Sequence, residues 1–288
     1  MSDFDSFAIE TTDPVHGRLS FDAIGAGPDD GELVLLLHGF PQTKRTWRLQ
    51  LPALAQAGYR AVAIDQRGYS PNARPKGVEA YHTDLLTADV LRVADALGAQ
   101  RFHLVGHDFG AVIGWQVAAR HPQRLATYTS VSVGHPLAYV AALGDPDGEQ
   151  KARSGYFEWF VDPDTDAELG SYERMHDLYL AAGLSAEDAV AYAQALGSPE
   201  AVGSGLNWYR ASGLHQIDGL SDVVVPTLLI WSTEDPALGL TQAAGSERYV
   251  SGPYRFETIE GIDHWVPEHA ADRVNTLLLE QIRAYPLG

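Results

Sequence analysis

The sequence predicts an α/β fold with a mostly parallel sheet and an inserted helical cap, and three observations support this. Short apolar runs alternate with stretches of helical spacing along most of the chain, as in successive βαβ units. One apolar run enters a glycine-flanked turn at 106–110 and continues into a helical stretch. The alternation stops between residues 134 and 225, a stretch too long for a simple loop. A sheet interrupted by a helical insertion accounts for all three.

Most elements can be placed from their apolar spacing and from the turn residues that bound them. We expect strands at 17–24, 32–37, 60–64, 101–105, 125–133, 227–231 and 254–259. We expect helices at 47–57, 83–97, 109–120 and about 267–284. Residues 1–134 and 226–288 would then form the core, and residues 135–225 the helical cap. Open α/β sheets bind ligands beyond the carboxyl ends of their strands, so we expect the cap there.

The composition is that of an ordinary soluble globular protein, with 45% hydrophobic and 20% charged residues. Lys and Arg total 20 against 38 Asp and Glu, a formal charge of −18, which argues against nucleic acid or an anionic membrane as a partner. The chain has no cysteine, which excludes disulfides and a thiol nucleophile. Neither a signal peptide nor an apolar run of ~20 residues is visible. We expect a cytoplasmic monomer or homodimer that needs no metal or cofactor.

The turn Gly106-His107-Asp108-Phe109-Gly110 carries an aspartate where a serine usually stands in a strand-to-helix turn of this kind. Its two glycines allow a strained turn that lifts the central side chain above the sheet. A carboxylate with an ordinary pKa of ~3.9 is already ionised, so it can displace an oxygen or halide from a saturated carbon and become an ester. Water can then cleave that ester. The alternative is a helix N-cap aspartate without a chemical role.

An aspartate nucleophile needs a base that activates water and an acid that orients the base. His264 follows the last expected strand, and a glycine three residues earlier lets this loop turn inward. Asp235 follows the strand at 227–231 and is the expected acid, with Glu234 as the fallback. The alternatives are a surface histidine and an aspartate that forms a turn before Pro236.

Hydrolysis of the ester also requires donors for the oxyanion that forms. The strand at 32–37 leads into a His-Gly-Phe-Pro loop, which is expected to supply the backbone N–H of Phe40. Phe109, at a helix N-terminus, is expected to supply the second N–H. Pro41 has no N–H and constrains the turn. His38 is expected to brace this loop rather than to catalyse.

The chain resembles the epoxide hydrolase branch of the α/β-hydrolase superfamily in four motifs, at 38–41, 65–70, 106–111 and 261–265. The resemblance extends over nearly the whole chain and implies the α/β-hydrolase fold. It further implies that two cap tyrosines donate hydrogen bonds to the oxygen of an epoxide ring. The segments that resemble the tyrosine-bearing ones, at 154–160 and 206–210, place these tyrosines at Tyr156 and Tyr209. Either tyrosine could instead be a packing aromatic of the cap.

The resemblance implies that water converts a small apolar epoxide to a vicinal diol through an ester on Asp108. Substrate contacts are then expected from His38, Pro41, Phe109, Trp159, Trp208 and Trp265. Haloalkane dehalogenases share the core and are one alternative, although they commonly carry tryptophan and asparagine where this chain has Phe109 and Phe40. Haloacetate enzymes carry arginines beside the nucleophile, and 109–113 contains none. A non-hydrolytic or ring-closing relative is the other alternative. Phe109 also departs from the tryptophan common in epoxide hydrolases, which leaves the shape of the substrate open.

Overall fold

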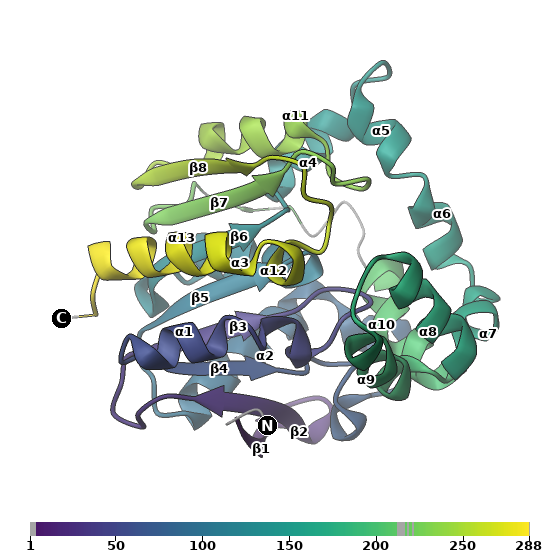
Figure 1. Cartoon of the computed structure of the whole chain (residues 1–288), viewed down its shortest axis with the longest axis horizontal. Coiled ribbons are helices and arrows are strands. Elements are labelled where there is room, and N and C mark those ends of the chain that lie inside the picture. The colour runs from purple at the N-terminus through teal and green to yellow at the C-terminus, as the bar shows by residue number, and fades with distance from the viewer. Residues whose placement is uncertain (1–3, 212–216, 218, 221, 288) are drawn as a thin grey trace.

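The computed structural model describes residues 4–211, 217, 219, 220 and 222–287. Within these residues the chain forms one eight-stranded sheet in the order β1-β2-β4-β3-β5-β6-β7-β8, with helices on both faces (Figure 1). Neighbouring strands from β4 across to β8 are parallel, whereas β2 pairs antiparallel with both β1 and β4. The predicted α/β class and its mostly parallel sheet are confirmed.

Every expected strand has a counterpart in the sheet, and one strand, β1, was not expected. The strands are β1 (Asp5–Asp13), β2 (Gly17–Ala26), β3 (Leu33–Leu37), β4 (Arg60–Ile64), β5 (Phe102–His107), β6 (Leu125–Val131), β7 (Thr227–Ser232) and β8 (Tyr254–Ile259). Strands β3, β5, β6 and β7 are buried along their whole length. Helices cover both faces of these central strands, so both sets of alternating side chains are removed from water.

Two pairs of helices sandwich the sheet. α1 (Leu51–Gln56) and α13 (Ala271–Ala284) pack on one face, in front of the sheet in Figure 1. α2 (Thr83–Ala96) and α3 (Phe109–Arg120) pack on the other face. Successive side chains of a strand point to opposite faces, so β3 contributes alternate leucines and valine to the two apolar layers.

Two of the expected helices are each divided. The stretch expected as one helix at 47–57 contains the end of the 3-10 turn η1 (Lys44–Trp47) and then α1, which has Pro52 in its first turn. Proline lacks an N–H and clashes with a preceding helical turn, so it can begin a helix but not continue one. The closing helix is likewise divided into α12 (Val266–His269) and α13.

A helical insertion lies between β6 and β7. In the part of the chain that the structure describes it comprises α4 (Pro136–Leu143), α5 (Glu149–Arg153), α6 (Tyr156–Val161), α7 (Thr165–Leu169), α8 (Tyr172–Ala181), α9 (Ala186–Leu196) and α10 (Pro199–Ala211). α6 to α10 stand beside one edge of the sheet, at the right in Figure 1. There Tyr179 of α8 donates to the carbonyl of Pro41, just beyond β3. α4 instead packs against α11 (Leu240–Ala244). The insertion therefore covers the carboxyl ends of the central strands.

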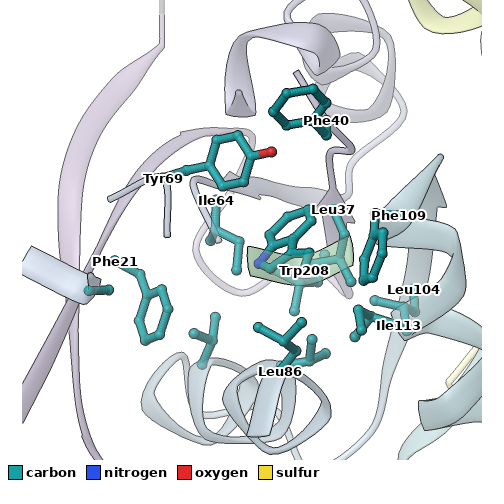
Figure 2. Close-up of a cluster of buried hydrophobic side chains, with 14 of the residues drawn as sticks. Phe21, Leu37, Phe40, Ile64, Tyr69, Leu86, Leu104, Phe109, Ile113 and Trp208 are labelled. Carbon is teal, nitrogen blue, oxygen red and sulfur yellow. The ribbon is translucent and has the colours of Figure 1, made fainter. Parts of the chain in front are cut away.

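A cluster of buried apolar side chains joins the insertion to the sheet (Figure 2). Trp208 of α10 lies among Leu37, Leu104 and Ile113, which come from β3, β5 and α3. The centroids of the Trp208 and Phe109 rings lie 5.0 Å apart. The indole N–H of Trp208 donates a hydrogen bond of 2.9 Å to the main-chain carbonyl oxygen of Arg67. Burial of large aromatic side chains contributes strongly to stability, so this cluster anchors the insertion.

None of the helices in the described ranges is long and apolar enough to cross a membrane.

Candidate active site

Asp108 lies at the turn between β5 and α3, at the carboxyl edge of the sheet. Its backbone has φ 50° and ψ −124°, a region that residues with a side chain rarely adopt. The turn is also tight, because a Cβ at Gly110 would lie 2.4 Å from the carbonyl oxygen of Leu37. Glycine therefore lets α3 begin this close to β3. The result is a strained turn that lifts the carboxylate of Asp108 above the sheet.

Two backbone N–H groups point at this carboxylate. The N–H of Phe40 donates to Oδ1 of Asp108 over 2.9 Å, and the N–H of Phe109 also donates to the carboxylate. A Cβ at Gly39 would lie 2.2 Å from the same Oδ1, so the loop after β3 can approach this closely because residue 39 is glycine. The sequence assigned the N–H groups of Phe40 and Phe109 to an oxyanion site. In the structure both lie at the carboxylate of Asp108.

His264 and Asp235 extend a line of polar groups away from Asp108. Nε2 of His264 lies 3.6 Å from Oδ2 of Asp108, and Nδ1 lies 2.8 Å from Oδ2 of Asp235. The other oxygen of Asp235 accepts two backbone N–H hydrogen bonds from the following turn, at 2.9 and 3.0 Å. Asp235 is buried, whereas the fallback residue Glu234 is exposed. Of the two candidate acids, the structure brings Asp235 to the histidine.

The charges of these three groups set one another's pKa. Burial alone would lower the pKa of His264, but the carboxylates of Asp235 and Asp108 outweigh it and raise the pKa to about 9. Burial raises the pKa of Asp108, against the opposing charge of His264 and the two N–H donors. Burial also acts to raise the pKa of Asp235, but the charge and hydrogen bond of His264 hold that pKa below its ordinary value. At neutral pH His264 is therefore an imidazolium, and it lies between the side chains of Asp108 and Asp235.

Tyr156 of α6 and Tyr209 of α10 line the same cavities as Asp108. Their ring centroids lie 6.4 Å apart, with an interplanar angle of 82°. Neither phenol hydroxyl is engaged in a hydrogen bond with another of the residues that the structure describes. Burial raises the pKa of both phenols well above the ordinary value of 10, so both keep their protons. Each tyrosine therefore lines both cavities with a protonated hydroxyl that has no hydrogen-bond partner among the described residues.

Two cavities meet at these residues. One, of about 220 Å³, is lined by His264, Pro41 and mostly apolar side chains of α6, α7 and α8. The other, of about 300 Å³, is lined mainly by apolar side chains of α3 and α4. Asp108, Tyr156 and Tyr209 line both cavities and so stand where the two join. An apolar space with a few convergent polar groups is the usual form of a site for a small molecule.

Three of the six residues expected to contact substrate line these cavities. Pro41 and Trp159 line the smaller cavity, and Phe109 lines the larger one. The other three line neither cavity: His38, Trp208 and Trp265. Trp208 is fully buried in the cluster of Figure 2, and Trp265 packs beside Tyr179 of α8. Both tryptophans support the walls of the site from behind, because large aromatics next to a cavity also serve to fill the core around it.

His38 lies beneath the loop that carries Phe40. Its ring nitrogens are hydrogen-bonded to the carbonyl of Gly39 at 2.9 Å and to the backbone N–H of Gln66 at 3.2 Å. Burial lowers the pKa of His38 to about 4, so the ring is neutral and can donate from Nδ1 while it accepts at Nε2. This ring ties the loop after β3 to the loop after β4, and so helps to hold the N–H of Phe40 against Asp108.

Two helices of the insertion form cavity walls that the sequence reasoning missed. Tyr139, Val140 and Leu143 of α4 line the larger cavity, and Met175 and Leu178 of α8 line the smaller one. The three residues of α4 follow Pro136 at intervals of three, four and seven, which is the spacing of one helix face. That spacing indicates an apolar face, but it does not distinguish the wall of a pocket from a packed core.

Among the described residues, no group of three or more His, Cys, Asp or Glu side chains could hold a metal ion.

Similarity to known proteins agrees with this geometry. The profile of a family described as alpha/beta hydrolase fold matches residues 32–270. AB hydrolase superfamily protein YfhM of Bacillus subtilis is 32% identical over 269 residues, which cover 90% of this chain and 92% of that protein. Epoxide hydrolase A of Mycobacterium tuberculosis is 32% identical over 300 residues, which cover 89% of this chain and 92% of that protein.

Solved structures show the same likeness. Epoxide hydrolase A from Mycobacterium thermoresistibile superposes with a TM-score of 0.83 at 28% identity, over 99% of this chain and 100% of that one. The epoxide hydrolase of Bacillus megaterium, solved in complex with an inhibitor, superposes with a TM-score of 0.84 at 26% identity, over 96% of this chain and 99% of that one. The likeness therefore includes the helical insertion as well as the sheet. This chain belongs to the α/β-hydrolase fold family, in the branch that contains the epoxide hydrolases.

Proposed function

We propose that this protein is an epoxide hydrolase that adds water to an apolar epoxide and releases a vicinal diol. The proposal depends on one observation: a carboxylate and two protonated phenols meet at the junction of two apolar cavities. Opening of an epoxide needs a nucleophile at a ring carbon and an acid at the ring oxygen. This site offers both. The names of the similar proteins point the same way.

In the first step the carboxylate of Asp108 attacks a ring carbon, and the bond from that carbon to the ring oxygen breaks. The oxygen becomes an alkoxide and takes a proton from Tyr156 or Tyr209, which leaves a hydroxyl group on the substrate and a phenolate on the enzyme. A phenol suits this role: burial holds its pKa well above the ordinary value of ~10 and so keeps it protonated at neutral pH, while an alkoxide is basic enough to take the proton. The product of this step is an ester on Asp108.

Ester formation changes the charge around His264. It removes the charge of Asp108, one of the two carboxylates that raise the pKa of His264, so the imidazolium loses its proton more readily. That proton replaces the one that the phenol gave up, which closes the proton count of the first step.

In the second step the neutral His264, oriented by Asp235, takes a proton from water as the water attacks the ester carbonyl. The N–H groups of Phe40 and Phe109 then stabilise the oxyanion. Collapse of this intermediate releases the diol and restores both the carboxylate of Asp108 and the imidazolium.

The variant His264→Gln tests this scheme, because attack by Asp108 does not use the imidazole as a base, and water can reprotonate the phenol in its place, whereas hydrolysis of the ester needs the base. With styrene oxide we expect the variant to stop once the ester has formed, before the diol is released, with the peptide that contains Asp108 heavier by the mass of the substrate. His269→Gln is the matched control. Its Nδ1 also lies 2.8 Å from a carboxylate oxygen, that of Asp263, but His269 is exposed. We expect this control to turn over like the wild type.

Three other results would contradict the proposal. The first is a wild-type protein that forms no diol from styrene oxide, a terminal alkyl oxirane or a trans-disubstituted epoxide. The second is halide release from bromoalkanes without diol formation, which would assign a dehalogenase. The third is thermal stabilisation by epoxides without turnover, which would indicate a non-hydrolytic relative.

A further inference from the structure

A buried chain of hydrogen bonds runs behind the base and has no part in the reaction described above. Oε1 of Glu268, on α12, lies 2.8 Å from Nε2 of Gln42. The other end of this carboxamide, Oε1 of Gln42, lies 2.9 Å from Nδ1 of His107. Nε2 of His107 in turn lies 2.9 Å from the main-chain carbonyl oxygen of His264. The chain therefore connects a carboxyl group to the backbone of the base itself.

The carboxyl group of Glu268 is itself enclosed by both the sheet domain and the insertion. Its Oε1 accepts hydrogen bonds from the hydroxyl of Thr46 at 2.9 Å and from the hydroxyl of Tyr192, on α9, at 2.8 Å. Its Oε2 is shielded from solvent and has no hydrogen-bond partner among the described residues. A charged carboxylate oxygen in that state is costly, whereas the carbonyl oxygen of a neutral acid is much less so.

His107 determines the direction of the hydrogen bonds in the chain. Its Nε2 must donate, because the carbonyl oxygen of His264 can only accept. Burial lowers the pKa of His107 well below its ordinary value, so the ring is neutral and has a single N–H. Nδ1 must then accept, and Gln42 must present its NH₂ group to it. A half-turn of the carboxamide achieves this, because it exchanges the oxygen and the nitrogen and leaves the rest of the side chain in place.

That orientation places the carbonyl oxygen of Gln42 against two oxygens, Oε1 of Glu268 and Oγ1 of Thr46, each at 2.8 Å. Thr46 has one hydroxyl hydrogen, which can serve either this contact or its own contact with Oε1 of Glu268. Close oxygens without a hydrogen between them repel each other, so a proton on Glu268 supplies the second hydrogen that this group of oxygens needs. Burial favours this state, since it raises the pKa of Glu268 to about 7. The donor count and the burial of the carboxyl group therefore agree.

We propose that Glu268, as a neutral carboxylic acid, is a positioning residue for the base His264. Its proton orients Gln42, the carboxamide of Gln42 selects the tautomer of His107, and the N–H of His107 holds the main chain of His264. The inference rests on the proposed function, in which His264 acts in the second step. It predicts that ionisation of Glu268 slows hydrolysis of the ester and leaves the attack by Asp108 unaffected.

When Glu268 loses its proton, the direction of the hydrogen bonds along the chain reverses. Gln42 turns its NH₂ group towards the charged carboxylate, and its oxygen accepts the hydrogen of His107 at Nδ1. Nε2 of His107 then faces the carbonyl oxygen of His264 without a hydrogen, so the loop that carries the base loses this bond. The titratable and charged groups that face the two ends of the chain are Arg48 and Tyr192 at Glu268, and His264, Asp235 and His38 at His107.

Glu268→Gln tests the proposal, because the amide keeps the shape and a donor towards Gln42 but cannot ionise. His264, with a pKa of about 9, titrates in both proteins, so the ratio of the two kcat values reports on Glu268. We expect kcat of the wild type relative to that of the variant to fall at least about threefold from pH 6.5 to pH 9. Glu260→Gln, an exposed glutamate four residues before His264, is the matched control and should follow the wild type. An alkaline fall in the Glu268→Gln variant that matches the wild type would overturn the proposal.

Glu268→Leu removes the proton at every pH and separates the two steps. We expect kcat to fall by about tenfold and KM to fall with it, because ester accumulates on Asp108 when hydrolysis alone is slowed. The mass of the Asp108 peptide during turnover measures the accumulation. A variant that slows ester formation instead, with no adduct in the steady state, would contradict a positioning role at the base.

A measurement without substrate separates this inference from the proposed function. The ¹⁵N shifts of the imidazole of His107 report which ring nitrogen carries the hydrogen. We expect hydrogen on Nε2 at pH 6 in both proteins, and a change to Nδ1 at higher pH in the wild type but not in Glu268→Gln. A wild-type tautomer that does not change with pH would overturn the inference. A tautomer change in a protein that hydrolyses no epoxide would instead refute only the proposed function.

Discussion

At the scale of single residues, Asp108 and Asp235 show how surroundings give two carboxylates different properties. Both lie beside His264, Asp235 fully buried and Asp108 partly exposed to the cavities, yet the pKa of Asp108 is raised and the pKa of Asp235 is lowered. Asp235 bonds the imidazole at 2.8 Å, whereas Asp108 lies 3.6 Å from it, beyond hydrogen-bond distance. The effect of burial therefore dominates the pKa of Asp108, whereas the opposite charge of His264 dominates the pKa of Asp235. The proposed nucleophile is the carboxylate whose charge is less well compensated.

Replacing the phenols tests their proposed role as acids. Tyr156→Phe and Tyr209→Phe should each slow ester formation roughly 10- to 100-fold, because the remaining phenol still donates, and the double variant should lose roughly 10³-fold or more. Rapid-quench measurement of the first turnover gives these rates. Tyr139→Phe is the control, since Tyr139 also lines the larger cavity but its hydroxyl is already hydrogen-bonded to Ser154 at 2.9 Å. A single variant with the wild-type rate would remove that phenol from the mechanism.

At the scale of elements, β1 is the strand that apolar periodicity did not reveal. Its inward-facing positions are Ile9, Thr11 and Asp13, so only one of the three is apolar. Asp13 is buried against Arg67, with 2.7 Å between the guanidinium and the carboxylate, and Arg67 also bonds Asp89 of α2 at 2.6 Å. A buried guanidinium needs such partners. The end of β1 is therefore held by charge pairing with residues far along the chain.

Asp13→Asn should destabilise the protein, because it leaves Arg67 with an incomplete set of buried partners. We expect a loss of about 3 kcal/mol, which corresponds to a fall in Tm of roughly 6–12 °C for a chain of this size class. Thermal denaturation at pH 7 measures this. Asp5→Asn, at the exposed start of β1, is the control and should leave Tm unchanged.

The pH dependence of this difference follows from the lowered pKa of Asp13. Burial opposes that lowering, but the hydrogen bond from Arg67 outweighs it. A lowered folded-state pKa gives stability that is complete above the unfolded pKa of ~3.9 and is lost as the pH falls below it. The gap between the wild type and Asp13→Asn should therefore shrink in acid. A gap that stays constant down to the pH of acid unfolding would argue against the charge pairing.

At the scale of the whole molecule, the helical insertion divides the space above Asp108 in two. One cavity is bounded by α6, α7 and α8 and the other by α3 and α4, and the proposed reacting groups stand between them. An epoxide with one apolar group on each ring carbon could place one group in each cavity. We therefore expect disubstituted epoxides to be accepted as well as terminal ones.

Val140→Trp should separate the two cavities in function, because a larger side chain on α4 fills part of the larger cavity. We expect kcat/KM to fall by about tenfold or more for a trans-disubstituted epoxide and by less than about threefold for a small terminal one. Initial rates of diol formation give both values. Val161→Trp, at an exposed position of α6, is the control for the added bulk. Equal losses on both substrates would show that one cavity holds the whole substrate.

Local patterns were enough to predict the strands of the parallel sheet, the turn at Asp108, and the order of Asp108, Asp235 and His264 along the chain. Apolar spacing and turn chemistry involve neighbours within a few residues, so they can be seen in the linear sequence. The same patterns failed where the decisive contacts are remote. They did not separate the cavity walls on α4 from core. They also could not show that Trp208 and Trp265, where the family resemblance implied substrate contacts, pack behind the two cavities.

The sequence alone predicts an aspartate nucleophile, a histidine base with the acid that orients it, and the α/β fold that carries these residues. The folded arrangement supplies what the sequence alone does not: which tyrosines line the same cavities as the carboxylate, how the cavity is divided, and which groups hold the base. Gln42 and Glu268 meet although they are 226 positions apart along the chain. Such pairings depend on how the helices and strands pack, and the pKa of a group depends on that packing as well, because burial and neighbouring charges exist only once the chain has folded.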